Sequence, residues 1–335
     1  MDVETAETPQ RWKTVLKPAL KLGVAALLIA WVVGGDWHGM LESVRRMNPL
    51  WVLLCFCAQF IQMTLTGVRW KFLIGRDLNV SWYETMRLVF IGLFSNIFIP
   101  AGAVGGDVVK AAMLASKRKG LRIEATVSVL MDRIVGVAGL FLLVLLFFGV
   151  TFSKVMELPA AAQSVVFLLT ALSAAGCVII AVLFFQDFIF RWKPAAELLA
   201  FADRWLRGIP GNVIRSVSAY RNRWKTLIWT TLFSALILHP LLMLAIFFPL
   251  YGSMHELPPA DTTMAAVAYG NVASAIPLTP GGLGTRDAVI KTLLSAWSIP
   301  EASAAAAMVI YTAMMLLINL LGGIAFLLPA DLRKK

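Results

Sequence analysis

The chain has 335 residues, of which 59% are hydrophobic and 15% charged, with a formal net charge of +11 at pH 7 and a mean hydropathy of +0.78. Soluble globular proteins average about 25% charged residues, so this composition excludes an ordinary soluble domain and indicates a polytopic membrane protein. We expect one integral membrane domain over residues 1–335, whose positive charge orients it in the bilayer and does not bind nucleic acid.

Six windows are long and apolar enough to cross a bilayer, which takes about 20 helical residues. They lie near residues 18–35, 50–68, 126–150, 160–186, 227–250 and 303–328. The first follows four basic residues, as in a secretory signal peptide. No clear small-x-small cleavage site ends it, so we expect an uncleaved helix.

The basic residues favour one orientation of these helices. A cytoplasmic N-terminus places most of them on one side, in the segments 11–21, 69–87, 110–122, 191–225 and 333–335. This positive-inside pattern predicts that both termini are cytoplasmic. Residues 187–225 combine eight basic residues with three tryptophans, and we expect them to form amphipathic helices at the cytoplasmic surface of an anionic leaflet.

Residues 96–110 read N-I-F-I-P-A-G-A-V-G-G-D-V-V-K. They are too apolar for a surface loop and too rich in breakers for a continuous helix. A full span here would place the basic cluster at 117–119 outside, against the charge rule. We therefore predict a re-entrant hairpin over about 84–116, with a short full span as the alternative.

Residues 271–291 repeat the same order of Asn, Pro, Gly-Gly, Asp and Lys inside another apolar segment. We predict a second hairpin over about 263–300, which starts from the opposite side. The predicted fold is therefore all-α and polytopic, with six full transmembrane helices and two oppositely oriented re-entrant hairpins. Such inverted repeats are typical of transporters, in which broken helices meet around the substrate at mid-membrane.

Irregular backbone at membrane depth is tolerated only where protein or a water-filled cavity satisfies its polar groups, so we expect a polar cavity between the hairpins. The pairs Gly105-Gly106 and Gly281-Gly282 immediately precede predicted helices. The free N–H groups and the dipole of a helix N-terminus favour an anion such as a phosphate.

Charged residues follow both glycine pairs. Asp107 either caps its helix and occupies those donors, or pairs with a cation or carries a proton. At the second hairpin, Thr285 is a possible N-cap, which leaves Arg286 and Asp287 to face the cavity.

Two further pairs of residues occupy matching positions in the repeat. Asn96 and Asn271 either satisfy the broken backbone or contact the ligand. Lys110 and Lys291 lie about one turn into the following helices, where each either reaches a head group or snorkels to the nearest interface.

Arg133 lies inside a predicted span, where insertion costs at least about 2.5 kcal/mol. Its sequence neighbour Asp132 points to a different face of the helix, so we expect Asp107 to pair with Arg133. His239-Pro240 interrupts a later span, where the missing proline N–H predicts a kink. We expect a neutral His239 that is hydrogen-bonded to a neighbouring helix.

The motifs of several enzyme classes are absent from the sequence. It has no G-x-x-x-x-G-K-[ST], H-E-x-x-H or G-x-S-x-G motif and three His in all, and Cys55, Cys57 and Cys177 lie in apolar segments without metal or redox spacing. We therefore expect no catalytic residues, no metal site, no cofactor and no ATP-driven transport within this chain.

Four motifs resemble those of a known family. They are R-W-K-x-L at 69–73, N-x-x-x-P at 96–100 with G-G-D at 105–107, D-R-x-x-G at 132–136, and the run from Asn271 through P-x-x-P-G-G-L-G at 277–284. They are similar to those of the flippase-like membrane proteins that include the transmembrane part of lysylphosphatidylglycerol synthase, the multiple peptide resistance factor. That family usually has Glu where this chain has Asp132 and Asp287, a change that keeps the charge and shortens its reach.

The resemblance implies translocation of a phospholipid or a modified, for example aminoacylated, lipid between leaflets of a bacterial-type cytoplasmic membrane. We expect a lipid flippase or transporter, not an enzyme, with no soluble aminoacyl-transferase domain in this chain. An intramembrane lipid-modifying transferase and a scaffold for a separate lipid synthase are the alternatives. The predicted head-group site comprises Asn96, Gly105, Gly106, Asp107, Lys110, Asp132, Arg133, Asn271, Gly281, Gly282, Arg286, Asp287 and Lys291.

Overall fold

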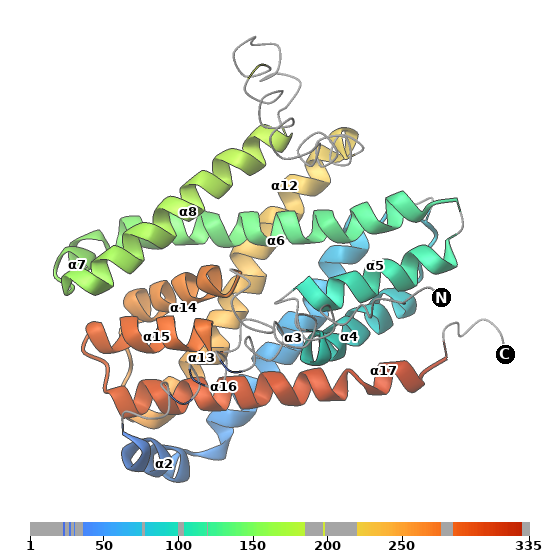
Figure 1. The fold of residues 1–335 in the computed structure, drawn as a ribbon. Helices are drawn as coiled ribbons and strands as arrows, with labels where there is room; N and C mark the ends of the chain where they lie inside the picture. The colour runs from blue at the N-terminus through green and yellow to red at the C-terminus, as the bar shows by residue number, and fades with distance from the viewer. Residues whose placement is uncertain are drawn as a thin grey trace, which may run out of the picture.

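The computed structural model describes residues 36–75, 78–99, 104–118, 120–184, 220–275 and 284–329, together with Gly23, Leu27, Ala30 and Glu197. Over these ranges the protein is helical and has no strand (Figure 1). The first predicted span near 18–35, most of the basic segment 187–225 and residues 333–335 lie outside them.

Fifteen helical elements lie in the described ranges. They are α2 (Trp37–Arg46), α3 (Pro49–Leu73), α4 (Trp82–Phe98), α5 (Gly105–Lys117), α6 (Arg122–Val150), α7 (Phe152–Met156), α8 (Ala160–Phe184), the 3-10 turn η3 (Arg221–Arg223), α12 (Trp224–Phe233), the π-helical segment η4 (Ser234–Leu238), α13 (His239–Met254), α14 (Ala260–Ala275), α15 (Thr285–Ala296), α16 (Glu301–Leu321) and α17 (Ile324–Leu327).

Five helices in the described ranges are long and apolar enough to cross a membrane. They are Pro49–Leu73, Arg122–Val150, Ala160–Phe184, Trp224–Met254 and Glu301–Leu327. They coincide with the last five of the six predicted windows, since the first window lies outside the described residues.

Local sequence explains where several of these helices start and bend. Asn48 accepts a hydrogen bond from the Leu50 N–H (2.9 Å) and Ser81 accepts one from the Glu84 N–H (3.1 Å), as N-cap residues do. Pro240 lacks the N–H that would continue the helix, and the π-helical segment η4 lies directly before His239-Pro240. This irregularity in the helix lies at the position where the sequence predicts a kink.

The first broken segment forms a pair of antiparallel helices, α4 and α5. Asn96 near the end of α4 accepts a hydrogen bond from the Gly106 N–H at the start of α5 (2.6 Å). At the far end of the pair, Glu84 of α4 forms an ion pair with Lys117 of α5 (3.1 Å). The residues that connect the two helices, 100–103, lie outside the described ranges.

The second broken segment forms the pair α14 and α15, which lie side by side in Figure 1. Gly270 of α14 packs against the side chain of Ile290 of α15. Ala265–Tyr269 of α14 are fully buried in the largest apolar core. Such small residues let helix backbones approach closely in membrane proteins, so this pair lies inside the bundle.

The two pairs open toward opposite ends of the bundle (Figure 1). At one end, Tyr83 at the start of α4 donates to the carbonyl of Pro329 beyond α17 (2.9 Å). At the other end, Lys154 of α7 forms an ion pair with Asp261 at the start of α14 (2.6 Å), and the indole N–H of Trp297 beyond α15 donates to the Lys154 carbonyl (3.4 Å). The end of α4 and the start of α5, and likewise the end of α14 and the start of α15, therefore lie toward the middle of the protein.

Close packing at the crossing of α4 and α5 yields a stability prediction. A Cβ on Gly106 would overlap the backbone carbonyl of Gly92, whereas a Cβ on Gly149 would meet no atom within 4 Å. We predict that Gly106→Ala lowers the melting temperature of the detergent-solubilised protein, because overpacking costs about 1–3 kcal/mol. Gly149→Ala is the matched control and should leave it unchanged or raise it. Equal melting temperatures for the two variants would contradict the described helix contact.

Candidate functional site

A cavity of about 300 Å³ lies between the two helix pairs. Its lining includes Asn96 and Gly106 from the first pair and Asn271, Ser274 and Arg286 from the second, with further residues from α3, α6, α13 and α16. The volume is at the lower end of the roughly 300–1,000 Å³ range of small-molecule pockets. A cavity is therefore present between the broken segments, as predicted, and its lining mixes polar and charged side chains with apolar ones.

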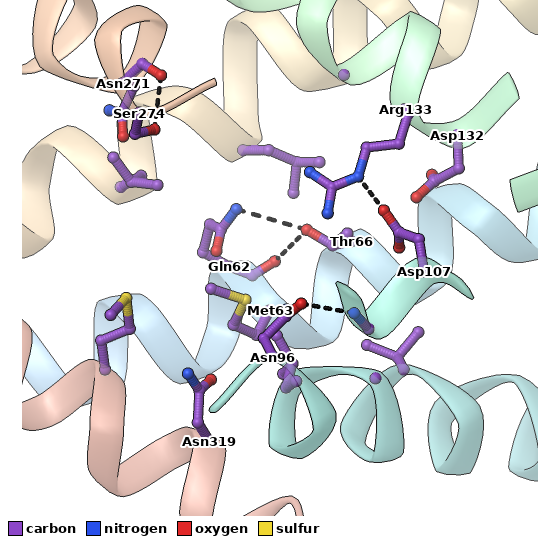
Figure 2. Close-up of a pocket in the computed structure, with 18 of the residues that line it drawn as sticks. Gln62, Met63, Thr66, Asn96, Asp107, Asp132, Arg133, Asn271, Ser274 and Asn319 are labelled. Carbon is purple, nitrogen blue, oxygen red and sulfur yellow. Dashed lines mark hydrogen bonds and ion pairs between the residues drawn. The ribbon is translucent and has the colours of Figure 1, made fainter. Parts of the chain in front are cut away.

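Asp107, in the first turn of α5, is the centre of a charged cluster in the cavity wall. Its carboxylate is 2.7 Å from the Lys110 ammonium, and it accepts a hydrogen bond from Nε of Arg133 on α6 (Figure 2). The Asp107–Arg133 pair is the one predicted from the sequence. The N-cap of α5 is Val104 and Asp107 is the third residue of the helix, so its alternative role as the N-cap is wrong.

Asp132 pairs with Arg69 of α3 and forms a separate ion pair. Arg69 Nε lies 2.8 Å from the Asp132 carboxylate, and Arg69 Nη1 donates to the Ser234 hydroxyl of η4 (2.9 Å). A Cβ on Gly136 would lie 2.8 Å from Arg69 Nη1, so this glycine leaves room for the guanidinium. Because residues i and i+1 of a helix face different directions, Asp132 and Arg133 bring two separate ion pairs to the cavity wall.

Arg286 carries the charge of the second helix pair into the cavity. Its Nη2 lies 2.7 Å from the carboxylate of Asp287 and donates to the Thr312 hydroxyl (2.9 Å). The guanidinium carbon lies 4.3 Å from the centre of the Tyr311 ring, a cation–π contact. Arg286 and Asp287 are 5% and 3% exposed, so the Arg286 side chain is held by contacts on several sides.

The start of α15 differs from the expectation. Gly284, with φ of +80°, is the N-cap, and Thr285 is the first helical residue. The N-cap position has a positive φ, which favours glycine because glycine has no Cβ. Gly284 therefore occupies this position, and the prediction of Thr285 as the N-cap is wrong. Asp287 accepts from the Gly284 N–H (3.3 Å) and does not line the cavity, whereas Arg286 does.

The two predicted asparagines both line the cavity. Asn96 accepts the Gly106 N–H, so it satisfies one N–H at the helix break and occupies one of the donors expected to face an anion. Asn271 donates from Nδ2 to the Val267 carbonyl within its own helix (2.9 Å). Gly105 is buried in the first turn of α5 and is not part of the lining.

Three other residues predicted for the site belong to the second broken segment, and none of them is among the described residues of the cavity lining. Lys291 forms an ion pair with Glu301 at the start of α16 (2.6 Å) and does not line the cavity. Lys291 lies in the second turn of α15, and this ion pair joins α15 to the start of α16. Gly281 and Gly282 lie outside the described residues.

Several polar residues of the lining were not among the predicted site residues. Gln62, Thr66 and Arg69 of α3 and Asn319 of α16 line the cavity (Figure 2). His239 also lines it, and its Nε2 lies 2.9 Å from the Gly136 carbonyl, as expected for a histidine bonded to a neighbouring helix. The sequence signal that could have identified these lining residues is their polarity inside apolar spans, since polar residues in such spans usually face the protein interior or a cavity.

Within the described ranges there is no group of three or more His, Cys, Asp or Glu side chains that would hold a metal ion. The cavity instead presents guanidinium, ammonium, carboxylate and amide groups. Groups of these kinds form ion pairs and hydrogen bonds with charged or hydroxylated ligands in proteins generally.

The Arg69–Asp132 pair yields a second stability prediction. Removing one partner leaves an uncompensated buried charge, which costs about 3–5 kcal/mol, whereas replacing both partners by apolar residues is often nearly neutral. We predict that Arg69→Met lowers the melting temperature and that adding Asp132→Leu restores most of the loss. Melting curves of both variants in detergent test this. A double variant that is less stable than Arg69→Met would contradict the direct pairing.

The sequence of the chain is similar to those of known membrane proteins. Residues 19–323 match the family described as the lysylphosphatidylglycerol synthase TM region. A UPF0104 membrane protein of Methanocaldococcus jannaschii is 25% identical over 80% of this chain and 81% of its own length. One of Methanothermobacter thermautotrophicus is 24% identical over 86% of this chain and 88% of its own length.

A third relative aligns over a shorter region. A UPF0104 membrane protein of Pyrococcus horikoshii is 29% identical over 133 residues, which are 38% of this chain and 38% of that protein. The matched family region includes every helix from α2 to α16 and all of the cavity residues named above. The chain is therefore a multi-pass membrane protein that belongs to the lysylphosphatidylglycerol synthase TM region family.

Proposed function

We propose that the protein moves a lipid between the leaflets of the cytoplasmic membrane, with the head group in the cavity and the acyl chains in the bilayer. The observation that carries this proposal is the set of charged side chains that both helix pairs direct to one cavity. Asp107 and Lys110 come from the first pair and Arg286 from the second, and Arg133 joins them from α6. Ionisable residues at such depth in a membrane protein usually mark a substrate path.

The proposal places both helix pairs in the membrane as re-entrant hairpins. α4 and α14 have 17 and 16 residues, so each is about 24–26 Å long, shorter than a hydrocarbon core of roughly 30 Å. Because the pairs open toward opposite ends, one hairpin enters from each side. Inverted broken helices around a central site are typical of proteins with alternating access.

The charge distribution supports a cytoplasmic location for the end where α4 begins. The basic residues described near this end are Lys71, Arg87, Lys117, Arg118, Arg122, Arg223 and Lys225. The opposite end has Arg45, Arg46 and Lys154, and Arg46 and Lys154 are paired with carboxylates. An excess of Lys and Arg in short loops identifies the cytoplasmic side.

The cavity groups also suggest how a head group is held during passage. Asp107 holds two cations, Lys110 and Arg133. A phosphate that enters the cavity competes with this carboxylate for both of them, and charge-assisted bonds to Arg and Lys compensate for its lost hydration. Rocking of one hairpin against the other would then expose the same group to the other leaflet.

A transport measurement tests the proposal. Purified protein in vesicles should speed leaflet exchange of fluorescent phospholipids, and Asp107→Asn with Arg286→Gln should slow this exchange by at least about tenfold, since it removes a charged contact from each hairpin. Ser116→Ala, at the exposed end of α5 outside the cavity lining, is the matched control and should exchange lipids at the wild-type rate.

The same experiment separates the alternatives. A double variant that is folded by size-exclusion chromatography and exchanges lipids at the wild-type rate would overturn the proposed site. Absence of exchange of every lipid in vesicles that contain folded wild-type protein would overturn transport and favour a lipid-modifying transferase or a scaffold for a separate synthase.

A further inference from the structure

The ammonium group of Lys110 lies against an aromatic ring as well as against a carboxylate. Its Nζ lies 5.0 Å from the centre of the Trp70 ring, within the roughly 6 Å that defines a cation–π contact. The distance from Nζ to the Asp107 carboxylate is 2.7 Å. Lys110 lines the cavity, whereas Trp70 does not. A residue outside the lining therefore contacts one of the cations of the cavity.

Trp70 is fixed in the protein interior. It lies in the last turn of α3 and is fully buried. It belongs to a small apolar core that also includes Leu88 of α4, Leu114 of α5 and Val129 of α6. Because protein interiors are close-packed, the ring cannot turn without disturbing the helices around it.

The stem of Lys110 passes a glycine of α4. A Cβ on Gly92 would lie 3.0 Å from Cγ of Lys110 and 3.1 Å from its Cδ. The absence of a side chain at Gly92 therefore leaves room for the lysine stem between α4 and α5. Three helices build the contact, since α3 supplies the ring, α5 supplies the cation and α4 supplies the space.

The indole N–H of Trp70 explains nothing about why a tryptophan occupies this position. Its Nε1 is buried and has no hydrogen-bond partner in the part of the chain that the structure describes. An unsatisfied buried donor is costly, and phenylalanine or leucine would contribute to the apolar core without this cost. The ring is what remains to explain the residue, because tryptophan attracts a cation more strongly than phenylalanine does.

An aromatic ring holds a cation differently from a carboxylate. The face of the ring attracts the ammonium through its quadrupole and carries no net charge. Trp70 therefore holds Lys110 without cancelling its positive charge, whereas Asp107 cancels one charge. A phosphate that competes with Asp107 for Lys110 would find the ammonium still held by the ring.

Building on the proposed function, we infer that Trp70 is a positioning residue for lipid transport. Its ring holds the Lys110 ammonium at the cavity wall while the phosphate of a lipid head group takes the place of Asp107. Trp70 does not touch the lipid and acts only through Lys110. The ligand of Lys110 is the phosphate, which phospholipids and aminoacylated phospholipids share.

A double-variant cycle in vesicles that contain the purified full chain tests whether Trp70 acts through Lys110. Trp70→Leu removes the ring and should slow leaflet exchange of fluorescent phosphatidylglycerol by about fivefold or more. Lys110→Met removes the cation and should slow exchange at least as much. The combined variant should match Lys110→Met within about twofold, because the ring then has no ammonium to hold. A combined variant slowed by the full product of the two single effects would overturn the inference.

Trp51 provides the matched control. It belongs to the same helix, and its ring packs against Phe248 and Tyr251 of α13, outside the cavity lining. Trp51→Leu removes a ring of the same size and should leave the exchange rate at the wild-type value. Equal slowing by Trp51→Leu and Trp70→Leu would indicate a loss of packing common to both and would contradict the specific role of Trp70.

A conservative variant separates the ring from the volume it fills. Trp70→Phe keeps an aromatic face that attracts a cation more weakly, so its exchange rate should lie between those of the wild type and Trp70→Leu. A rate at or below that of Trp70→Leu would overturn the inference. If Trp70→Leu does not fold, the cycle with Lys110→Met is made with Trp70→Phe, and independence of the two effects again overturns the inference.

The wild-type protein distinguishes this inference from the proposed function. Exchange by the wild type together with independent effects of the two substitutions would overturn the role of Trp70 and leave lipid transport intact. Exchange of no lipid by folded wild-type protein would overturn the proposed function and, with it, the role of Trp70.

Discussion

The shared carboxylate of Asp107 is the interaction on which the account of the site depends. It joins two elements, because Lys110 follows it in α5 and Arg133 belongs to α6. A buried guanidinium or ammonium is tolerated only when it is paired and hydrogen-bonded, so Asp107 holds both cations at the cavity wall. Asn96 accepts the Gly106 N–H next to Asp107, so one free N–H at the start of α5 is satisfied by an amide while the Asp107 carboxylate binds the cations.

Sequence patterns identified the parts of this arrangement that are local or repeated. The breakers and the repeated order of Asn, Pro, Gly-Gly, Asp and Lys predicted two broken segments, and the cost of an unpaired arginine predicted the Asp107–Arg133 pair. Arg69 and Asp132 are 63 residues apart in the sequence, and nothing local indicates that α3 and α6 bring them together. The contact of Lys291 with Glu301 joins α15 to α16 and likewise could not be read from local sequence. The N-cap of α15 is Gly284, one residue before the Thr285 that the sequence suggested. Pairings between helices were therefore less predictable than the helices themselves.

The cavity also explains why this family region combines charge with an apolar chain. Three ion pairs or clusters lie in its walls, and each links different helices or anchors a helix start. In a bilayer, apolar surfaces alone give little drive for helices to associate, so these polar contacts contribute specificity of packing as well as a binding surface. In the proposed transport, a ligand that competes for the cations would loosen contacts between helices and would thereby couple its binding to movement of the hairpins.

The central claim is that the two helix pairs are re-entrant and enter from opposite sides. The most direct test is labelling of single cysteines by a membrane-impermeant maleimide in intact cells, in a background that lacks Cys55, Cys57 and Cys177. Each cysteine replaces an exposed residue near the point where the chain enters or leaves a helix pair. These residues are Asn79 and Ser116 for the first pair, and Glu256 and Ser298 for the second. The account predicts that Glu256→Cys and Ser298→Cys react in intact cells, while Asn79→Cys and Ser116→Cys react only after permeabilisation. Reaction of Asn79→Cys and Ser116→Cys from different sides would show that the first pair crosses the membrane and would contradict the account.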